Sequence, residues 1–225
     1  MINDLSKLIE AENKAAILFE EIQNKKLIIE GKSEKDLNSE IFNLALELFN
    51  IKKYWHKRIV RAGKNTLLPY QENPPDLILQ GDDILFLDFG PVFDEWEADF
   101  GRTYVIGSNE KKLKLKQDVE LAWHEGKKYF IEHKDQITGA EFYNFTCELA
   151  KKYSWEYGNE HGGHLVGHFP HETIIGEDRI NYIHPENTLL MCNKDPFGKD
   201  RHWIYEIHFI DSKMEIGGFF EQLLF

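Results

Sequence analysis

Two stretches decide how this chain folds: Leu87-Asp88-Phe89-Gly90 and, after a short insert, Ala98-Asp99-Phe100-Gly101-Arg102-Thr103. They place two carboxylates eleven residues apart among Ile, Leu, Phe, Val and Tyr side chains. A buried Asp is costly unless it is paired or bound to a metal. Two of them on neighbouring strands therefore need a cation, a hydrogen-bond network or solvent.

The residues around these stretches predict alternating helices and strands. Apolar residues at helical spacing predict helices over 5–29, from Ser33 to about residue 48, and over 113–129, and a Thr138-Gly139-Ala140-Glu141 capping box opens a fourth. Strands are expected over 55–62, 84–89, from Pro91 into Ile106, and over 188–192, 203–210 and 218–224, with a proline-rich loop over 64–82.

The order of these elements suggests an internal repeat. Two helix–helix–strand–strand halves predict an α+β fold, pseudo-twofold around one mixed sheet. No low-complexity linker separates the halves, so a single domain over 1–225 is expected.

Composition narrows the class of protein. Hydrophobic residues make up 42% of the 225-residue chain and aromatic residues 13%, which is enough for a substantial core. A net charge of −12 argues against a nucleic-acid groove and against an anionic membrane surface. The two cysteines have no ligand spacing, and neither a signal peptide nor a bilayer-length apolar run is present, so a soluble, cytoplasmic protein is expected.

Three further segments carry imidazole or carboxylate groups in unusual surroundings. Residues 160–172 hold four histidines between glycines, whereas Glu206 and Glu221 each stand alone among large apolar residues. Each has an ordinary explanation by itself, such as a hydrogen-bonded turn or a solvent-facing side chain. Together with the two aspartates they form a hard, oxygen-rich set with one nitrogen donor. Such a set suits two divalent ions, manganese, cobalt, iron or zinc.

The order Asp88, Asp99, His164, Glu206, Glu221 resembles the pita-bread metallopeptidases, which include methionine aminopeptidases, Xaa-Pro aminopeptidases and prolidases. Arg102-Thr103 matches the Arg-Thr that follows the second ligand in that family. The run Gly163-His164-x-x-Gly167-x-x-x-His171-Glu172 is similar to the family's Gly-His-Gly-Ile-Gly…His-Glu stretch.

The resemblance implies a fold and a division of roles. The fold would be the pita-bread (creatinase/aminopeptidase-like) α+β fold, here as a stand-alone catalytic domain. Asp88 would bind one ion, and His164 and Glu206 the other. Asp99 and Glu221 would bridge both. Glu206 would also be the general base, and His171 would stabilise the oxyanion formed when metal-activated water attacks a peptide carbonyl.

Several positions depart from the family pattern. Tyr70, in Leu68-Pro69-Tyr70, stands where the family carries a His that contacts the scissile amide, and Phe219 stands where Xaa-Pro enzymes carry Arg. Tyr70 and His161 are therefore predicted to contact the substrate, and His56 is left among the histidines without a recognised pattern.

Three functions stay open. The first is an aminopeptidase or Xaa-Pro-type dipeptidase acting on small peptides or related amides. The second is a hydrolase or lyase of the same fold that acts on a small metabolite, which the changed residues at 70 and 219 would permit. The third is a non-catalytic binding module, which the complete ligand set disfavours. The sequence leaves metal identity and oligomeric state open, a homodimer included.

Overall fold

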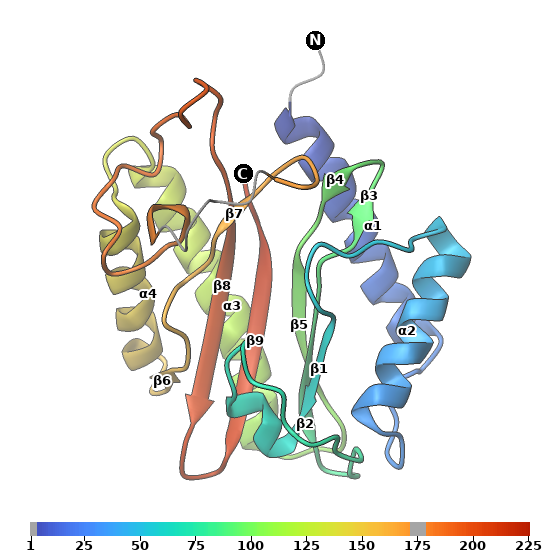
Figure 1. Ribbon diagram of the computed structural model, residues 1–225. Helices are drawn as coiled ribbons and strands as arrows, with labels where there is room; N and C mark the ends of the chain where they lie inside the picture. The colour runs from blue at the N-terminus through green and yellow to red at the C-terminus, as the bar shows by residue number, and fades with distance from the viewer. Residues whose placement is uncertain (1–3, 172–178) are drawn as a thin grey trace.

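Two pairs of helices pack against one antiparallel sheet (Figure 1). The computed structural model describes residues 4–171 and 179–225. The first half of the chain forms α1 (Asp4–Asn24), α2 (Glu34–Phe49), β1 (Ile59–Ala62), a 3₁₀ helix (Gly63–Leu67), β2 (Ile84–Phe89), β3 (Val92–Phe93), β4 (Trp96–Glu97) and β5 (Phe100–Val105). The second half forms α3 (Glu110–His133), α4 (Gly139–Lys152), β6 (Glu156–Tyr157), β7 (Leu165–Val166), a second 3₁₀ helix (Arg179–Asn181), β8 (His202–Asp211) and β9 (Ile216–Leu224).

The sheet has the strand order β1-β2-β5-β9-β8-β6, with β7 also paired to β8. Each half therefore runs from an edge strand to the centre, where β5 meets β9, and this arrangement carries the expected pseudo-twofold repeat. The prediction of a mixed sheet is wrong for the described strands, because every pair among them is antiparallel. The short Asp211–Ile216 connection between β8 and β9 shows the reason, since closely connected neighbours run in opposite directions.

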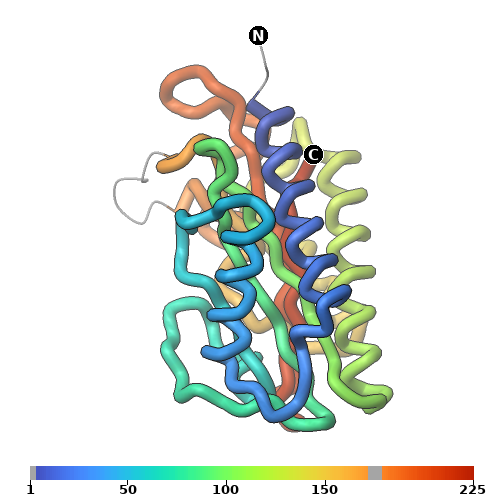
Figure 2. The backbone as a smooth tube through the Cα atoms, turned by 90° about the vertical axis from the view of Figure 1, so that its right-hand side faces the viewer, coloured from blue at the N-terminus to red at the C-terminus, as the bar shows by residue number. Residues whose placement is uncertain are grey.

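Each helix pair has its own core. Phe19 of α1 and Leu37 of α2 pack with Phe89 of β2, whereas Trp123 of α3 and Phe142 of α4 pack with the strands β8 and β9. In Figure 2 the strands β8 and β9 (red) run between α3 on one side and the connections that precede β1 and β8 on the other. These connections approach the face of the sheet that α3 leaves free.

Local signals explain where the helices begin. The Ser33 hydroxyl accepts a hydrogen bond from the Asp36 amide and caps α2, and Thr138 forms the predicted capping box with Glu141 at the start of α4. The first helix ends at Asn24, earlier than the apolar periodicity predicts, because Lys26 adopts a left-handed conformation with φ 53°.

Two predicted strands are corrected. The strand over 55–62 is confined to Ile59–Ala62, because Trp55 instead donates its indole N–H to the Ala98 carbonyl and turns away from the ladder. The predicted strand over 188–192 is a turn with a single bridge to Thr138, since the Asn187 side chain accepts a hydrogen bond from the Leu189 amide and closes a local turn.

The remaining strand predictions over 84–89, 203–210 and 218–224 are confirmed. The long segment from Pro91 to Ile106 divides into β3, β4 and β5. Among the described residues, no helix has the length and apolar character needed to cross a membrane.

Candidate metal centre

The register of the central strands brings three of the predicted ligands into one row. Asp88 of β2 faces Gly101 of β5, Gly101 faces Glu221 of β9, and Glu221 faces Glu206 of β8. Directly opposed residues of antiparallel strands present their side chains on the same face of the sheet. The three carboxylates therefore project together, and Asp99 precedes β5 beside them.

Gly101 makes room at the centre of this row. A Cβ added there would lie 2.5 Å from the Phe219 ring and 2.9 Å from the Glu221 Cβ. The glycine of the Phe100-Gly101-Arg102 stretch is thus required by the close approach of β5 and β9, and it leaves space for the carboxylates on either side.

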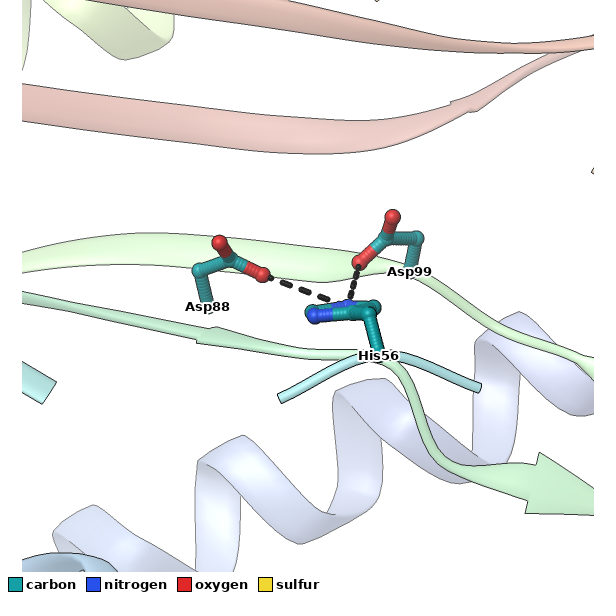
Figure 3. A group of neighbouring side chains, drawn as sticks. All are labelled: His56, Asp88 and Asp99. Carbon is teal, nitrogen blue, oxygen red and sulfur yellow. Dashed lines mark hydrogen bonds and ion pairs between the residues drawn. The ribbon is translucent and has the colours of Figure 1, made fainter. Parts of the chain in front are cut away.

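Two histidines complete the cluster. His164 places Nε2 3.1 Å from Asp99 Oδ2, 3.7 Å from Glu206 Oε1 and 4.0 Å from Glu221 Oε1. On the other side, His56 places Nε2 3.0 Å from Asp99 Oδ1 and 3.5 Å from Asp88 Oδ1, and Figure 3 shows the three side chains pointing toward one another. All the residues that were predicted as metal ligands therefore lie together, with His56 in addition: Asp88, Asp99, His164, Glu206 and Glu221.

The donor set fits divalent cations. Asp88 Oδ1 and Glu221 Oε2 are buried atoms that accept no hydrogen bond from the residues described. An orphaned buried carboxylate oxygen is costly, and a bound cation removes that cost. Two ligand groups can be drawn within this centre, each including one imidazole: His56 with Asp88 and Asp99, and His164 with Asp99 and Glu221.

The pKa values show how strongly the carboxylates crowd one another. Burial raises the pKa of Asp88 to about 7 and that of Glu206 to about 7, and burial together with the charge of Asp99 raises the pKa of Glu221 well above its usual value. Burial also acts to raise the pKa of Asp99, but the facing imidazoles His56 and His164 outweigh it and lower that pKa.

Burial has the opposite effect on the pKa values of the two imidazoles. Burial alone would lower their pKa values, but the neighbouring carboxylates outweigh it and raise the pKa of His56 and that of His164 each to about 9. Positive charge is therefore favoured at both ends of Asp99, which is the electrostatic condition that a pair of metal ions also satisfies.

The residues predicted to contact substrate line a cavity of about 330 Å³ beside the cluster. Tyr70 and His161 both contribute to its wall, together with Trp55, Phe219 and Tyr182. The Tyr70 hydroxyl accepts a hydrogen bond from the Lys57 amide at 3.2 Å, and the residue is 43% exposed. His161 Nδ1 lies 3.5 Å from Glu206 Oε1.

His171 also lines this cavity, and a buried glutamate holds it there. His171 donates from Nδ1 to Glu97 Oε2 at 2.5 Å, and its backbone amide donates to Glu97 Oε1 at 3.1 Å. The Gly167 amide also donates to Glu97. Glu97 therefore fixes the ring through Nδ1 and leaves the Nε2 atom unengaged by this carboxylate. Glu172, the next residue of the predicted motif, lies outside the described residues.

Sequence reasoning missed His56 and Glu97. His56 stands in Tyr54-Trp55-His56-Lys57, which lacks the glycines and regular spacing that marked the segment around His164. One signal was available in Gly90, because a Cβ there would lie 2.2 Å from His56 Cδ2 and 2.3 Å from Trp55 Nε1. Gly90, two residues after Asp88, therefore marks the place where the His56 and Trp55 side chains cross the end of β2.

The fold is shared with solved peptidase structures. A prolidase from Thermococcus sibiricus superposes with a TM-score of 0.74 at 23% identity, covering 98% of this chain and 56% of the other. A methionine aminopeptidase from Thermotoga maritima gives a TM-score of 0.71 at 15% identity, covering 98% of this chain and 91% of the other. The fold is therefore the pita-bread α+β fold, and in this chain it carries the carboxylate–imidazole centre described above.

The family follows from the sequence itself. The model of metallopeptidase family M24 matches residues 6–194, and the chain belongs to this family. The matched range contains Asp88, Asp99 and His164, whereas Glu206 and Glu221 lie beyond it and join the site through the strand register.

Curated relatives agree with this placement. The Xaa-Pro dipeptidase of Pyrococcus horikoshii is 28% identical over 169 residues, which are 70% of this chain and 47% of the relative. That of Pyrococcus furiosus is 27% identical over the same coverage. The chain thus spans about half the length of the curated relatives it matches.

Proposed function

We propose that this protein is a metallopeptidase that holds two divalent ions and hydrolyses small peptides, as an aminopeptidase or an Xaa-Pro-type dipeptidase. The observation that carries the proposal is the row Asp88–Gly101–Glu221–Glu206 across four strands, with Asp99 and His164 beside it. Family membership and the Xaa-Pro dipeptidase relatives support the same activity.

The ligand roles follow the positions of the side chains. Asp88 would hold one ion and His164 with Glu206 the other, while Asp99 and Glu221 lie between them and would bridge both. Manganese, cobalt, iron and zinc all accept such a set of oxygen and nitrogen donors. When bound, the ions would supply an acidified water as nucleophile and a Lewis acid for the scissile carbonyl.

Side chains of the protein would accept the proton and stabilise the negative charge that develops on the carbonyl oxygen. Glu206 would act as the general base, and the Asn159 amide donates to its Oε2 at 3.0 Å and fixes its orientation. The Nε2 edge of His171 would donate a hydrogen bond to the carbonyl oxygen as it becomes negative. Glu97 holds this ring by its other nitrogen.

The cavity limits the size of the substrate. Its volume of about 330 Å³ suits a di- or tripeptide, and its wall mixes aromatic side chains with a few polar groups. Tyr70 and His161 would contact the substrate near the reacting bond. The proposal includes a cytoplasmic location for the protein, which is consistent with a small peptide as substrate.

The test is metal loading followed by assay. Chelator-treated protein is reconstituted with manganese, cobalt, iron or zinc, its metal content is counted, and it is assayed on dipeptides, Xaa-Pro dipeptides and tripeptides that begin with Met. We expect two ions per chain and metal-dependent turnover. Asp99→Ala should lose the ions and about 10³-fold or more of the rate, since metal assistance is worth several kcal/mol.

Asp94→Ala is the matched control, because the Asp94 side chain is 83% exposed and its ion pair among the described residues is with Lys14. It should keep both the ions and the rate. Wild-type protein that binds no transition metal under any condition would contradict the proposal.

A second candidate is hydrolysis of a non-peptide amide or of a small metabolite. It is favoured by Tyr70 and Phe219, which both line the cavity at positions where the family carries His and Arg. N-acylated amino acids and other small amides included in the same panel separate the two candidates. Robust turnover of unmodified peptides would count against this second reading.

A further inference from the structure

His56 is held in the same way as His164. Each ring places its Nδ1 against the backbone carbonyl of the following residue, 2.7 Å for His56 to Lys57 and 2.9 Å for His164 to Leu165. Each then directs Nε2 at the carboxylate cluster. A metal-binding histidine characteristically donates its second ring N–H to a carbonyl or a carboxylate, which fixes both tautomer and orientation. Both histidines meet this condition.

Asp99 lies between the two rings and gives each a separate oxygen. Its Oδ1 is 3.0 Å from His56 Nε2, and its Oδ2 is 3.1 Å from His164 Nε2. The Trp55 indole contacts both imidazoles edge-on, with ring centroids 4.4 Å from His56 and 5.1 Å from His164. One aspartate and one tryptophan thus support two equivalent imidazoles.

One carboxylate oxygen of Asp88 also lacks a hydrogen-bond donor among the described residues. Asp88 Oδ1 lies 3.5 Å from His56 Nε2 and accepts no hydrogen bond from the described part of the chain. The His56 ring fits tightly against Gly90, where a Cβ would lie 2.2 Å away. His56 therefore stays beside Asp88 by packing, independently of the charge that it carries.

We propose that His56 is a metal ligand, the nitrogen donor of the ion held by Asp88 and Asp99. The proposal rests on the metal centre proposed above and adds a sixth protein ligand to it. Each ion then has one imidazole, one oxygen of Asp99 and one further carboxylate of its own, Asp88 on one side and Glu206 on the other. An imidazole on both ions favours transition metals over magnesium at both positions.

A different role for His56 predicts the opposite result. If His56 only paired with Asp88 and Asp99 as an imidazolium, it would occupy the place of a cation and compete with metal. Its removal would then strengthen metal binding. If it is a ligand, its removal weakens binding at one of two positions.

The experiment is a cobalt titration of the chelator-treated full chain, followed by calorimetry and by the visible absorption of Co²⁺. His56→Phe keeps a ring in the space beside Gly90 and removes both nitrogens, and His164→Phe does the same on the other side. His168→Ala is the control, because the His168 side chain is 56% exposed and faces Glu95. Circular dichroism and thermal unfolding of each metal-free variant check that it folds.

We expect two Co²⁺ ions per chain for the wild type and for His168→Ala. His56→Phe should bind one of the two about tenfold or more weakly and alter the absorption of that ion, and His164→Phe should weaken the other. Unchanged or tighter binding by His56→Phe, with two ions in the wild type, would overturn this inference and leave the proposed function standing. A wild type without bound cobalt would overturn both.

A second measurement does not depend on a variant that folds. Wild-type protein with ¹⁵N-labelled histidine is loaded with zinc, and the imidazole resonances are compared with those of the zinc-free protein. Two imidazoles with coordination shifts support the inference. A single shifted imidazole contradicts it.

Discussion

The two halves of this molecule bring matching sets of groups to the centre, but they hold them differently. The first half supplies His56, Asp88 and Asp99, and the second supplies His164 with two glutamates. In the second half, Glu206 accepts a hydrogen bond from Asn159. Two buried carboxylate oxygens accept none from the described residues, Asp88 Oδ1 in the first half and Glu221 Oε2 in the second.

This difference in hydrogen bonding indicates which carboxylates depend more on a bound cation. A carboxylate held by an amide keeps its place without a metal and is free to act as a base, whereas an unpaired buried one needs a counter-charge. We therefore assign the demand for a metal ion to Asp88 and Glu221, and proton transfer to Glu206.

After the loss of a metal ligand, the largest expected effect concerns a contact that crosses between the halves. Glu97, in β4 of the first half, holds His171 of the second, so Glu97→Gln should weaken the orientation of the ring while leaving every metal ligand in place. We expect kcat to fall about 100-fold with KM and metal content nearly unchanged.

Glu95→Gln is the control, because the Glu95 side chain is 72% exposed. Glu97→Asp should recover part of kcat, since it restores a charged acceptor. A loss of metal in Glu97→Gln, or an unchanged kcat, would show that Glu97 does not act by positioning His171.

The packing of the first half gives the next effect. Gly90→Ala would push a Cβ into the His56 and Trp55 rings, and overpacking of this kind costs about 1–3 kcal/mol. Chemical denaturation should show that loss, accompanied by weaker metal binding. Gly162→Ala is the matched control in the second half, because its Cβ would meet nothing closer than 3.3 Å. Equal stability of the two variants would contradict the tight fit of His56.

The third effect, on the pH dependence of stability, lies where α1 meets β9. Glu12 is 3% exposed, its carboxylate accepts a hydrogen bond from the Leu223 amide at 3.1 Å, and burial raises its pKa to about 8. The folded protein keeps a proton there that the unfolded chain releases above the ordinary value of 4.5, so stability falls as pH rises from 4.5 through 8.

Glu12→Gln should remove this loss, which for a shift of this size is on the order of a few kcal/mol between pH 5 and pH 8. Denaturation at several pH values measures it, with the exposed Glu20→Gln as control. An unchanged pH dependence in Glu12→Gln would show that Glu12 does not cause the slope.

The sequence predicted most of the secondary structure because its local signals are strong. The Thr138 capping box and the apolar run over 84–89 each act over a few residues, and both were found in place. The strand over 188–192 failed because a side-chain turn at Asn187 competes with the ladder, and apolar content alone does not reveal such a turn.

The site was predictable to the extent that its residues carry a pattern. Asp88 and Asp99 stood out as charges in apolar strands, and His164 stood out in its glycine-rich segment. Glu206 and Glu221 stood out as lone glutamates among large apolar residues, and the strand register explains why they meet. His56 could not be found, since the turn of 55–58 out of the β1 ladder brings it across Gly90, and that turn is a tertiary event.

The central claim is that both halves bind metal through one imidazole each, with Asp99 between them. Anomalous diffraction from zinc-loaded crystals at the metal edge tests it most directly. The account predicts two peaks, one beside the Nε2 atom of His56 and one beside that of His164, each at about 2.0–2.1 Å. A single peak on His164, with His56 still paired to Asp88 and Asp99, would contradict it.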